Sequence, residues 1–339
     1  MGTEIGDLLE KQEIEFEGLH GKKIAIDAYN TLYQFLSIIR QPNGTPLKDS
    51  KGRTTSHFSG LFYRTINLFE KGLEPIFVFD GKPPELKNKT LKERKNTRKT
   101  AKKEWKEAKQ KGKDKEAYKK AIRSSKLNKE MVENSKQLLD YMGVPYVQAP
   151  SEGEAQAAHM VKEEDSYAVG SQDFDSLLFG SPYLIKNLTI TGKRKLPGKD
   201  RYVEVNLERF NLEKSLNKLE ITKEQLIEIA ILIGTDYNEG IKGIGPKTAL
   251  KKIKEHQNID TVLAEIDESI DNVKEIKQIF LNPKISEEYE IEWNEPKNSE
   301  MKKFLCDERD FSENRVNKGI KRLEKSISDI RNQATLDSF

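Results

Sequence analysis

Cysteine is almost absent from this chain of 339 residues. Cys306 is the only one, which excludes an intramolecular disulfide and a zinc site built from several thiolates. Histidine is scarce as well, because only four residues are spread through the sequence. Any metal that the protein binds should therefore be a hard cation held by oxygen ligands.

Long apolar runs are also missing. No stretch approaches the roughly 18 consecutive apolar residues that a membrane-spanning helix requires. The opening residues, MGTEIGDLLEKQEIEFEG, lack the basic-then-apolar layout of a signal peptide. We therefore expect a soluble protein of the reducing cytoplasm, monomeric on its own and without a membrane partner.

Charged residues are abundant and unevenly distributed. They make up 34% of the chain, against about 25% in ordinary globular domains, yet the net charge is only +3. Residues 82–126 hold nineteen Lys and Arg against six acids, so this segment carries +13 and the remainder −10. Its few apolar residues cannot cover a core, so we expect charged helices that project into solvent. A solvated linker is the plain alternative, but such dense like charge favours a polyanionic partner.

Three short apolar runs each end at or just before an aspartate. The runs at residues 24–26 and 75–79 precede Asp27 and Asp80, and the stretch YAVG, from Tyr167, precedes SQDFD. Stretches with helical periodicity lie between these runs and end in glycine, as helices commonly do. The alternation predicts an α/β fold with a central, largely parallel sheet flanked by helices. Ligands of such sheets gather at the carboxyl ends of the strands.

Seven carboxylates at strand ends or loop–helix junctions are the candidate metal ligands. We expect Glu152 and Glu154 in the first turn of a helix that starts at Pro150–Ser151. Asp173 and Asp175 should share one face of an extended stretch. Two Mg²⁺ ions about 4 Å apart on such oxygen ligands can promote phosphodiester hydrolysis. Singly, each acid could instead form a turn or meet a helix dipole. The seven are Asp27, Asp80, Glu152, Glu154, Asp173, Asp175 and Asp236.

A glycine-rich hairpin, GIKGIGPKTALKKI, begins at Gly240 and leads into a basic helix. Gly243 and Gly245 would let the backbone approach a phosphate closely, and the helix N-terminus would then offer N–H donors. Lys242 and Lys247 add positive charge. An ordinary turn between two helices is the alternative, but the position just after Asp236 favours phosphate binding.

Several motifs, in order, resemble the flap endonuclease family of 5′-nucleases in its archaeal form. They include IAIDAYNTLYQFL, FVFDGKPPELK, APSEGEAQAAH, SQDFDSLLFG and GTDYNEGIKGIGPKTA, and the resemblance extends over essentially the whole chain. It implies a PIN-like sheet with a basic helical arch and a helix–hairpin–helix element. It also implies cleavage of DNA whose 5′ flap is threaded under the arch, with 5′-to-3′ exonuclease activity. These reactions serve lagging-strand maturation and long-patch base-excision repair, so the protein should associate with the nucleoid.

The resemblance also gives individual residues a role. Lys87 and Arg94, seven apart, match a basic pair at the arch base and imply charge stabilisation in the transition state. Tyr33 matches an aromatic residue that stacks on a base near the scissile bond, although a core role is the alternative. One Mg²⁺, for which Mn²⁺ could substitute, is implied at Asp27, Asp80, Glu152 and Glu154, and a second at Asp173, Asp175 and Asp236, with Glu154 between them.

The same resemblance implies two surfaces for duplex DNA. The helix–hairpin–helix at about 226–256 would grip the downstream backbone, commonly with a bound K⁺, through Lys242, Gly243, Gly245 and Lys247. The upstream duplex and a short 3′ flap would be recognised by Arg40, Arg309 and Arg315.

The C-terminal sequence QATLDSF resembles a sliding-clamp box. Gln333, Leu336 and Phe339 match its glutamine, aliphatic and aromatic positions, although only one aromatic residue closes the box. We therefore expect a clamp of the PCNA type as a partner. The expected parts of the chain are an N-terminal nuclease part (1–99), an arch region (82–130), an internal nuclease part (116–258), a C-terminal DNA-contacting part (259–328) and a clamp-binding tail (329–339).

Two other functions remain open from the sequence. A bubble- or junction-cutting relative would share the carboxylates, although such proteins tend to carry long insertions or lack the arch. A non-catalytic DNA adaptor tethered to the clamp would not need a complete set of acids, and all seven are present.

Overall fold

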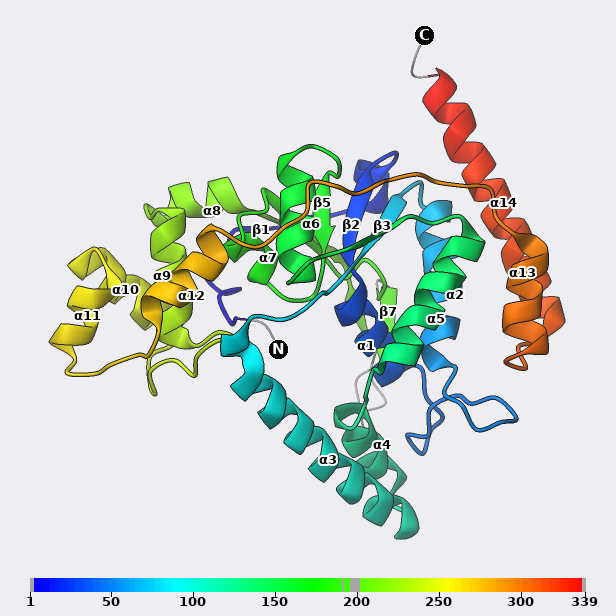
Figure 1. Cartoon of the computed structure of the whole chain (residues 1–339), viewed down its shortest axis with the longest axis horizontal. Helices are drawn as coiled ribbons and strands as arrows, with labels where there is room; N and C mark the ends of the chain where they lie inside the picture. The colour runs from blue at the N-terminus through cyan, green and yellow to red at the C-terminus, as the bar shows by residue number, and fades with distance from the viewer. Residues whose placement is uncertain (1–2, 191, 196–201, 337–339) are drawn as a thin grey trace.

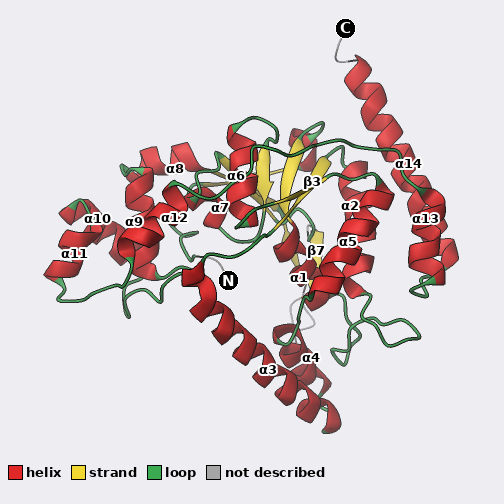
Figure 2. Ribbon diagram, viewed as in Figure 1, coloured by secondary structure: helices red, strands yellow, loops and turns green. Residues whose placement is uncertain are grey.

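The computed structural model describes residues 3–190, 192–195 and 202–336. A seven-stranded sheet in the order β1-β9-β6-β5-β2-β3-β4 forms its centre, with helices on both faces (Figures 1 and 2). Strands β6, β5, β2, β3 and β4 run parallel, whereas β9 is antiparallel to both β6 and β1. The prediction of a largely parallel sheet in an α/β fold is confirmed. The sheet strands are β1 (Lys11–Ile14), β2 (Lys23–Asp27), β3 (Glu74–Phe79), β4 (Tyr146–Gln148), β5 (Ala168–Gly170), β6 (Tyr183–Lys186) and β9 (Leu207–Asn211), and β7 (Gly192–Lys195) pairs with β8 (Tyr202–Val205).

Helices connect the strands and extend the fold on both sides of the sheet (Figure 1). In the described part of the chain, no helix is long and apolar enough to cross a membrane. The α-helices are α1 (Ala28–Ile38), α2 (Ser56–Glu70), α3 (Asn88–Gln110), α4 (Asp114–Arg123), α5 (Lys129–Met142), α6 (Gly153–Lys162), α7 (Asp175–Leu178), α8 (Leu212–Leu219), α9 (Lys223–Ile233), α10 (Pro246–His256), α11 (Ile259–Glu265), α12 (Val273–Leu281), α13 (Asn298–Lys302) and α14 (Glu313–Leu336).

The central strands are buried on both faces, which explains why their sequences are continuous apolar runs. Successive side chains of a strand point to opposite faces. Ile24 and Ile26 of β2 accordingly pack in the core formed with α1, α2, α5 and α14, whereas Ala25 packs in the core on the α6 and α9 side. The predicted strands therefore end where expected: Asp27 is the last residue of β2, and Asp80 directly follows β3.

The basic segment forms a helical hairpin of α3 and α4 that projects away from the sheet (Figure 1). The predicted charged helices are thus present. Only Ala101 and Ala108 of α3 are buried, and α3 packs mainly against α4. Trp105 Nε1 donates to the carbonyl of Asn43 at 3.3 Å, which ties the hairpin to the loop after α1. The remaining surface of α3 is left to its lysines and arginines.

Three further features flank the sheet. Helices α9 and α10 enclose the glycine-rich loop 234–245, as the hairpin sequence predicted. A long segment, residues 282–297, crosses the top of the molecule in Figure 1 from α12 to α13. Helix α14 continues through the first part of the predicted clamp-binding tail to Leu336, and Phe339 lies outside the described residues.

Candidate active site

The carboxyl ends of β2 and β3 bring the first two acids to the same edge of the sheet. Asp27 pairs in register with Val78, so Asp80 follows two residues further along the neighbouring strand. Asp27 also caps α1, since its Oδ1 accepts a hydrogen bond of 2.9 Å from the backbone N–H of Asn30. Strand end and helix cap together fix this side chain.

Glu152 and Glu154 reach the same edge from α6, but the helix begins later than predicted. It starts at Gly153, and Glu152 is its N-cap with extended backbone angles (φ −75°, ψ 127°). The reason is a tertiary contact: Asp80 Oδ1 accepts from the N–H of Gly153 at 2.7 Å. A Cβ at Gly153 would lie 2.6 Å from that oxygen, so this approach requires glycine.

Asp173 and Asp175 do not share an extended stretch, and that prediction is wrong. Strand β5 ends at Gly170, and Asp175 is the first residue of the short helix α7. The chain turns before Asp175, whose Oδ1 accepts from the buried backbone N–H of Thr3 at 2.9 Å. The N-terminal segment and the β5–α7 turn therefore position this carboxylate together.

The last acid and two cations complete the cluster. Asp236 follows α9 in the loop that leads to the hairpin, as predicted. Lys87 Nζ lies 2.5 Å from Glu152 Oε2 and 3.2 Å from Asp236 Oδ2. Arg94 forms an ion pair with Asp236 through its Nη2. The structure therefore places both cations of the arch base directly on the carboxylates.

Burial and mutual repulsion dominate the electrostatics of the cluster. Burial and the charge of Asp80 raise the pKa of Asp27 to about 8. Burial raises the pKa of Asp175 to about 6, and it also raises the pKa of Asp80, Glu152 and Glu154. Although burial alone would lower it, Glu152 and Asp236 raise the pKa of Lys87. Without further positive charge, burial and mutual repulsion therefore disfavour ionisation of these acids.

The oxygen ligands suit a hard divalent cation. Glu152 Oε1 is buried and has no hydrogen-bond partner among the residues that the structure describes. A buried oxygen of this kind is costly unless a cation or donor meets it. Within those same described residues, no three acids, histidines or cysteines already converge as a finished coordination shell. Lys87 and Arg94 partly neutralise the acids in the metal-free arrangement.

Tyr33 lies one turn beyond the cluster on α1. Its ring is partly buried against the core, and the Arg98 guanidinium of α3 lies over it, 5.0 Å from Cζ to the ring centroid. The ring thus joins the sheet edge to the arch, and a nucleobase would have to share this aromatic face with Arg98.

The predicted duplex contacts lie elsewhere and differ in exposure. Lys242 and Lys247 are exposed, and Gly243 adopts a left-handed backbone conformation (φ +90°). Arg40 instead donates to the carbonyls of Leu36 and Gly44, each at 2.8 Å, and therefore supports the loop after α1.

The two predicted arginines near the C-terminus also differ. Arg309 is only 7% exposed and lies with its Cζ 3.4 Å from the centroid of the Phe304 ring. Arg315 on α14 is exposed. The guanidinium of Arg315 is therefore open to a phosphate, whereas that of Arg309 is committed to packing.

Sequence reasoning missed the neutral residues that hold the acids in place. Asn30 Nδ2 donates to Asp173 Oδ2 at 2.9 Å, and Ser171 Oγ lies 3.1 Å from Glu154 Oε1. These partners are distant in sequence, so no local pattern reveals the contacts. The one signal was position, because both residues lie within three positions of a predicted ligand.

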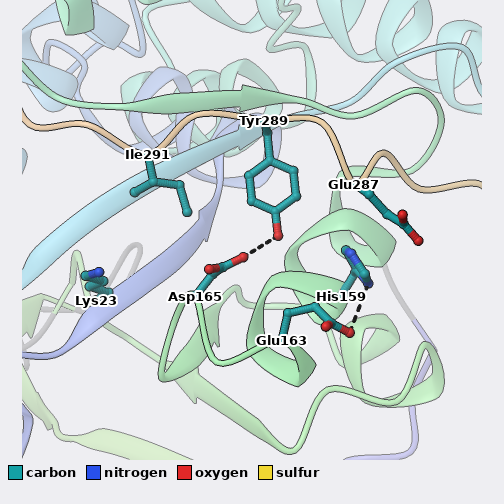
Figure 3. Close-up of a pocket in the computed structure, with 7 residues that line it drawn as sticks. All are labelled: Lys23, His159, Glu163, Asp165, Glu287, Tyr289 and Ile291. Carbon is teal, nitrogen blue, oxygen red and sulfur yellow. Dashed lines mark hydrogen bonds and ion pairs between the residues drawn. The ribbon is translucent and has the colours of Figure 1, made fainter.

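A cavity of about 730 Å³ lies away from the carboxylate cluster (Figure 3). Lys23, which begins β2 where Asp27 ends it, lines this cavity at the opposite edge of the sheet. Four of its polar side chains face one another in pairs: Tyr289 donates to Asp165 Oδ2 at 2.5 Å, and His159 lies 3.9 Å from Glu163. The cavity has none of the arch cations, so we place the candidate active site at the carboxyl edge.

Comparison with known proteins identifies the family. Residues 5–101 match the XPG N-terminal domain, and residues 143–236 match the XPG I-region. The chain is 56% identical to flap endonuclease 1 of Pyrococcus horikoshii, covering 100% of this chain and 98% of that protein. It is 53% identical to flap endonuclease 1 of Methanosarcina acetivorans, covering 100% of both.

Solved structures agree with the sequence comparison. Flap endonuclease-1 from Methanococcus jannaschii superposes with a TM-score of 0.77 at 43% identity, covering 97% of this chain and 99% of that chain. The catalytic core of Rad2 in complex with DNA shares the fold, with a TM-score of 0.70 at 23% identity over 94% of this chain and 97% of that chain. The protein therefore belongs to the flap endonuclease family of divalent-metal-dependent, structure-specific nucleases, which hydrolyse phosphodiester bonds.

Proposed function

We propose that this chain binds DNA with a displaced 5′ flap and cleaves the flap strand near the junction, with additional 5′-to-3′ exonuclease activity. Its role would be lagging-strand maturation and long-patch base-excision repair. One observation carries the proposal: the seven carboxylates influence one another electrostatically in a single cluster beside the start of the basic helix α3, and Lys87 and Arg94 form ion pairs with two of them, Glu152 and Asp236. A strand drawn in by the arch would thus arrive at the acids.

The cluster fits two Mg²⁺ ions, and Mn²⁺ has the same preference for oxygen ligands. The partnerless Glu152 Oε1 and the raised pKa values of the buried acids both indicate a site that needs added positive charge. Such ions, when bound, would activate water and stabilise charge on the scissile phosphate. The proposed ligands are Asp27, Asp80, Glu152 and Glu154 for one ion and Asp173, Asp175 and Asp236 for the other, with Glu154 between them.

Lys87 and Arg94 would act on the scissile phosphate itself. Both already face the carboxylates, and an arginine can donate two parallel hydrogen bonds to a phosphate. Once metal ions neutralise the acids, these cations can turn to the phosphate and stabilise the negative charge that develops during hydrolysis. Tyr33 would support the neighbouring base by stacking.

The remaining contacts would hold the two duplexes. Lys242, Gly243 and Gly245 lie in the loop before α10 and Lys247 in its first turn, where backbone N–H groups can meet a phosphate and the same loop would hold a K⁺ ion. The exposed Arg315 is suited to the upstream duplex. Arg40 and Arg309 would contribute there by shaping the surface, given their packed positions.

The C-terminal box would bind a sliding clamp of the PCNA type through Gln333, Leu336 and Phe339. Deleting residues 333–339 should leave cleavage of a flap substrate unchanged and remove its stimulation by the clamp, because none of the proposed metal ligands or arch residues lies in that segment. Clamp-stimulated rates of the full and shortened chains, measured side by side, test this. Undiminished stimulation of the shortened chain would contradict the role of the box.

A substrate panel tests the main proposal. Equal concentrations of 5′-flap, bubble and four-way junction DNA should be cut in Mg²⁺ with the flap strongly preferred, and product mapping should place the cut near the flap junction. Preferential cutting of the four-way junction or the bubble would instead show that the protein is a bubble- or junction-cutting nuclease. DNA binding without any cleavage would favour the adaptor.

A further inference from the structure

Each acid of the cluster has at least one carboxylate oxygen held by a protein donor, and Asn30 is a neutral residue that holds two of the acids at once. The backbone N–H of Asn30 donates to Asp27 Oδ1, and its side-chain Nδ2 donates to Asp173 Oδ2, both at 2.9 Å. Asp27 ends β2 and Asp173 follows β5, and these strands are parallel neighbours in which Ile26 pairs with Gly170. Asn30 therefore spans two segments whose acids would otherwise repel each other.

Ser171 makes a second bridge within the same cluster. Its hydroxyl is 3.1 Å from Glu154 Oε1 and 3.4 Å from Asp27 Oδ2, and it accepts from the N–H of Asp173 at 3.2 Å. The residue is only 5% exposed, so water does not readily replace these bonds. Ser171 thus connects the acid that would lie between the two ions to both neighbouring segments.

We propose that Asn30 is a positioning residue that sets the separation of Asp27 and Asp173, and with it the spacing of the two metal ions, and that Ser171 does the same for Glu154. This inference rests on the proposed metal site. The chemistry of the two residues suits the task, because both are neutral. They hold carboxylate oxygens without adding a positive charge. Lys87, by contrast, holds Glu152 with a positive charge that would compete with a bound cation. Residues that orient metal ligands in this way typically change metal affinity by about 10- to 100-fold when removed.

A purely structural role for Asn30 makes a different prediction. The bond that caps α1 comes from the backbone N–H, which Asn30→Ala retains. That variant removes only the side-chain bond to Asp173, and alanine is the better helix former. The fold without metal should therefore be unaffected, whereas the metal site should lose affinity.

The test is a titration of the full chain with Mn²⁺ in the absence of DNA. The electron paramagnetic resonance signal of free Mn²⁺ measures how much of the ion is bound. Asn30→Ala should weaken binding about tenfold, and Ser171→Ala should weaken it as well. Asn30→Ala should melt in EDTA at the temperature of the parent protein. In cleavage assays, the Mg²⁺ concentration for half-maximal rate should rise in Asn30→Ala, with most of the rate recovered at saturating Mg²⁺.

Two reference variants separate the possible failures. Gln34→Ala, on the same helix, removes the side-chain oxygen that accepts a hydrogen bond from the Thr189 hydroxyl, and this variant should bind Mn²⁺ like the parent. Asp173→Ala should lose one ion. If Asp173→Ala binds Mn²⁺ normally, the proposed metal site itself is wrong. If Asp173→Ala loses an ion but Asn30→Ala binds like the parent, the positioning role is overturned and the metal site stands.

Discussion

The arch and the carboxylate cluster hold opposite charge in opposite surroundings. The +13 segment is exposed to solvent, and α3 buries only two alanines. The acids lie at the edge of a buried sheet, and burial raises the pKa of five of them. Exposed charges are screened over about 10 Å at ordinary salt, so they act through their number. Buried charges act individually, because each one changes the ionisation of its neighbours.

The two regions meet at Lys87 and Arg94. These residues belong to the arch by sequence, but their ion pairs belong to the cluster. Lys89 shows the contrast, since its ion pair with Glu239 at 2.5 Å is largely exposed to solvent and such pairs contribute little. We therefore expect the effect of removing a charge to depend on the region it contacts. The predictions below run from the buried acids outward.

Removing one buried acid should have the largest effect. Asp173→Ala should lower the rate of flap cleavage in Mg²⁺ at least about a thousandfold, because a lost metal ion forfeits several kcal/mol of transition-state stabilisation. Binding of the flap substrate should persist, since the arch is unchanged. Single-turnover rates and binding isotherms measure both quantities. Glu163→Gln, at the exposed far end of α6, is the matched control and should cleave normally.

Removing Lys87 or Arg94, the positive side chains where the arch meets the cluster, should have the second-largest effect. Lys87→Ala and Arg94→Ala should each lower the single-turnover rate by roughly 100- to 1,000-fold, with a much smaller change in substrate Kd. Lys92→Ala, an exposed lysine of the same helix, should change neither quantity by more than a few-fold. If the junction variants altered only Kd and its salt dependence, the two residues would be ordinary phosphate contacts.

Neutralising exposed arch residues should have a moderate effect on binding alone. A triple variant with Lys99, Lys102 and Lys106 changed to Gln should bind a flap about tenfold more weakly at low salt. The slope of log Kd against log salt should fall by about 0.7 for each lost single-strand phosphate contact. The rate at saturating enzyme should be unchanged. A large loss of that rate would show that the outer arch positions the strand as well as capturing it.

The smallest expected effect is on stability. A carboxyl group whose pKa is higher in the folded than in the unfolded chain stabilises the fold while protonated, and this contribution is lost as pH rises through the folded value. Asp27 (about 8) and Asp175 (about 6) predict that the metal-free protein melts at lower temperature at pH 8.5 than at pH 5.5, by roughly 5 °C.

The isosteric variant Asp27→Asn checks the source of this trend. Asparagine can still cap α1, but it does not titrate. Melting curves in EDTA should therefore depend less on pH in this variant than in the parent. Adding Mg²⁺ to the parent at pH 8.5 should recover most of the lost stability. Equal pH dependence in both proteins would assign the trend to other groups.

The sequence predicted the acids better than the backbone around them. Asp27 and Asp80 could be placed because continuous apolar runs end at them, and parallel strands carry their ends to one edge. The start of α6 could not be placed, because it depends on the hydrogen bond between Gly153 and Asp80. The turn before Asp175 likewise depends on the contact with Thr3, which is 172 residues away.

The contacts within the site were beyond sequence reasoning for the same reason. Lys87 was recognised from its motif, but its partners Glu152 and Asp236 follow only from the folded chain. No sequence pattern singled out Asn30, although it joins two acids. Local patterns report strand and helix ends, whereas the bridges between distant segments arise from the tertiary structure.

The central claim is that the buried acids bind two metal ions at the base of the arch. Anomalous diffraction from crystals of the full chain soaked in Mn²⁺ tests it most directly. The account predicts two anomalous peaks at the carboxyl edge of the sheet, one beside Asp27 and Asp80 and one beside Asp173 and Asp175. Crystals of Asp173→Ala should retain the first peak and lose the second. Peaks only at other sites, or none in the parent protein, would contradict the account.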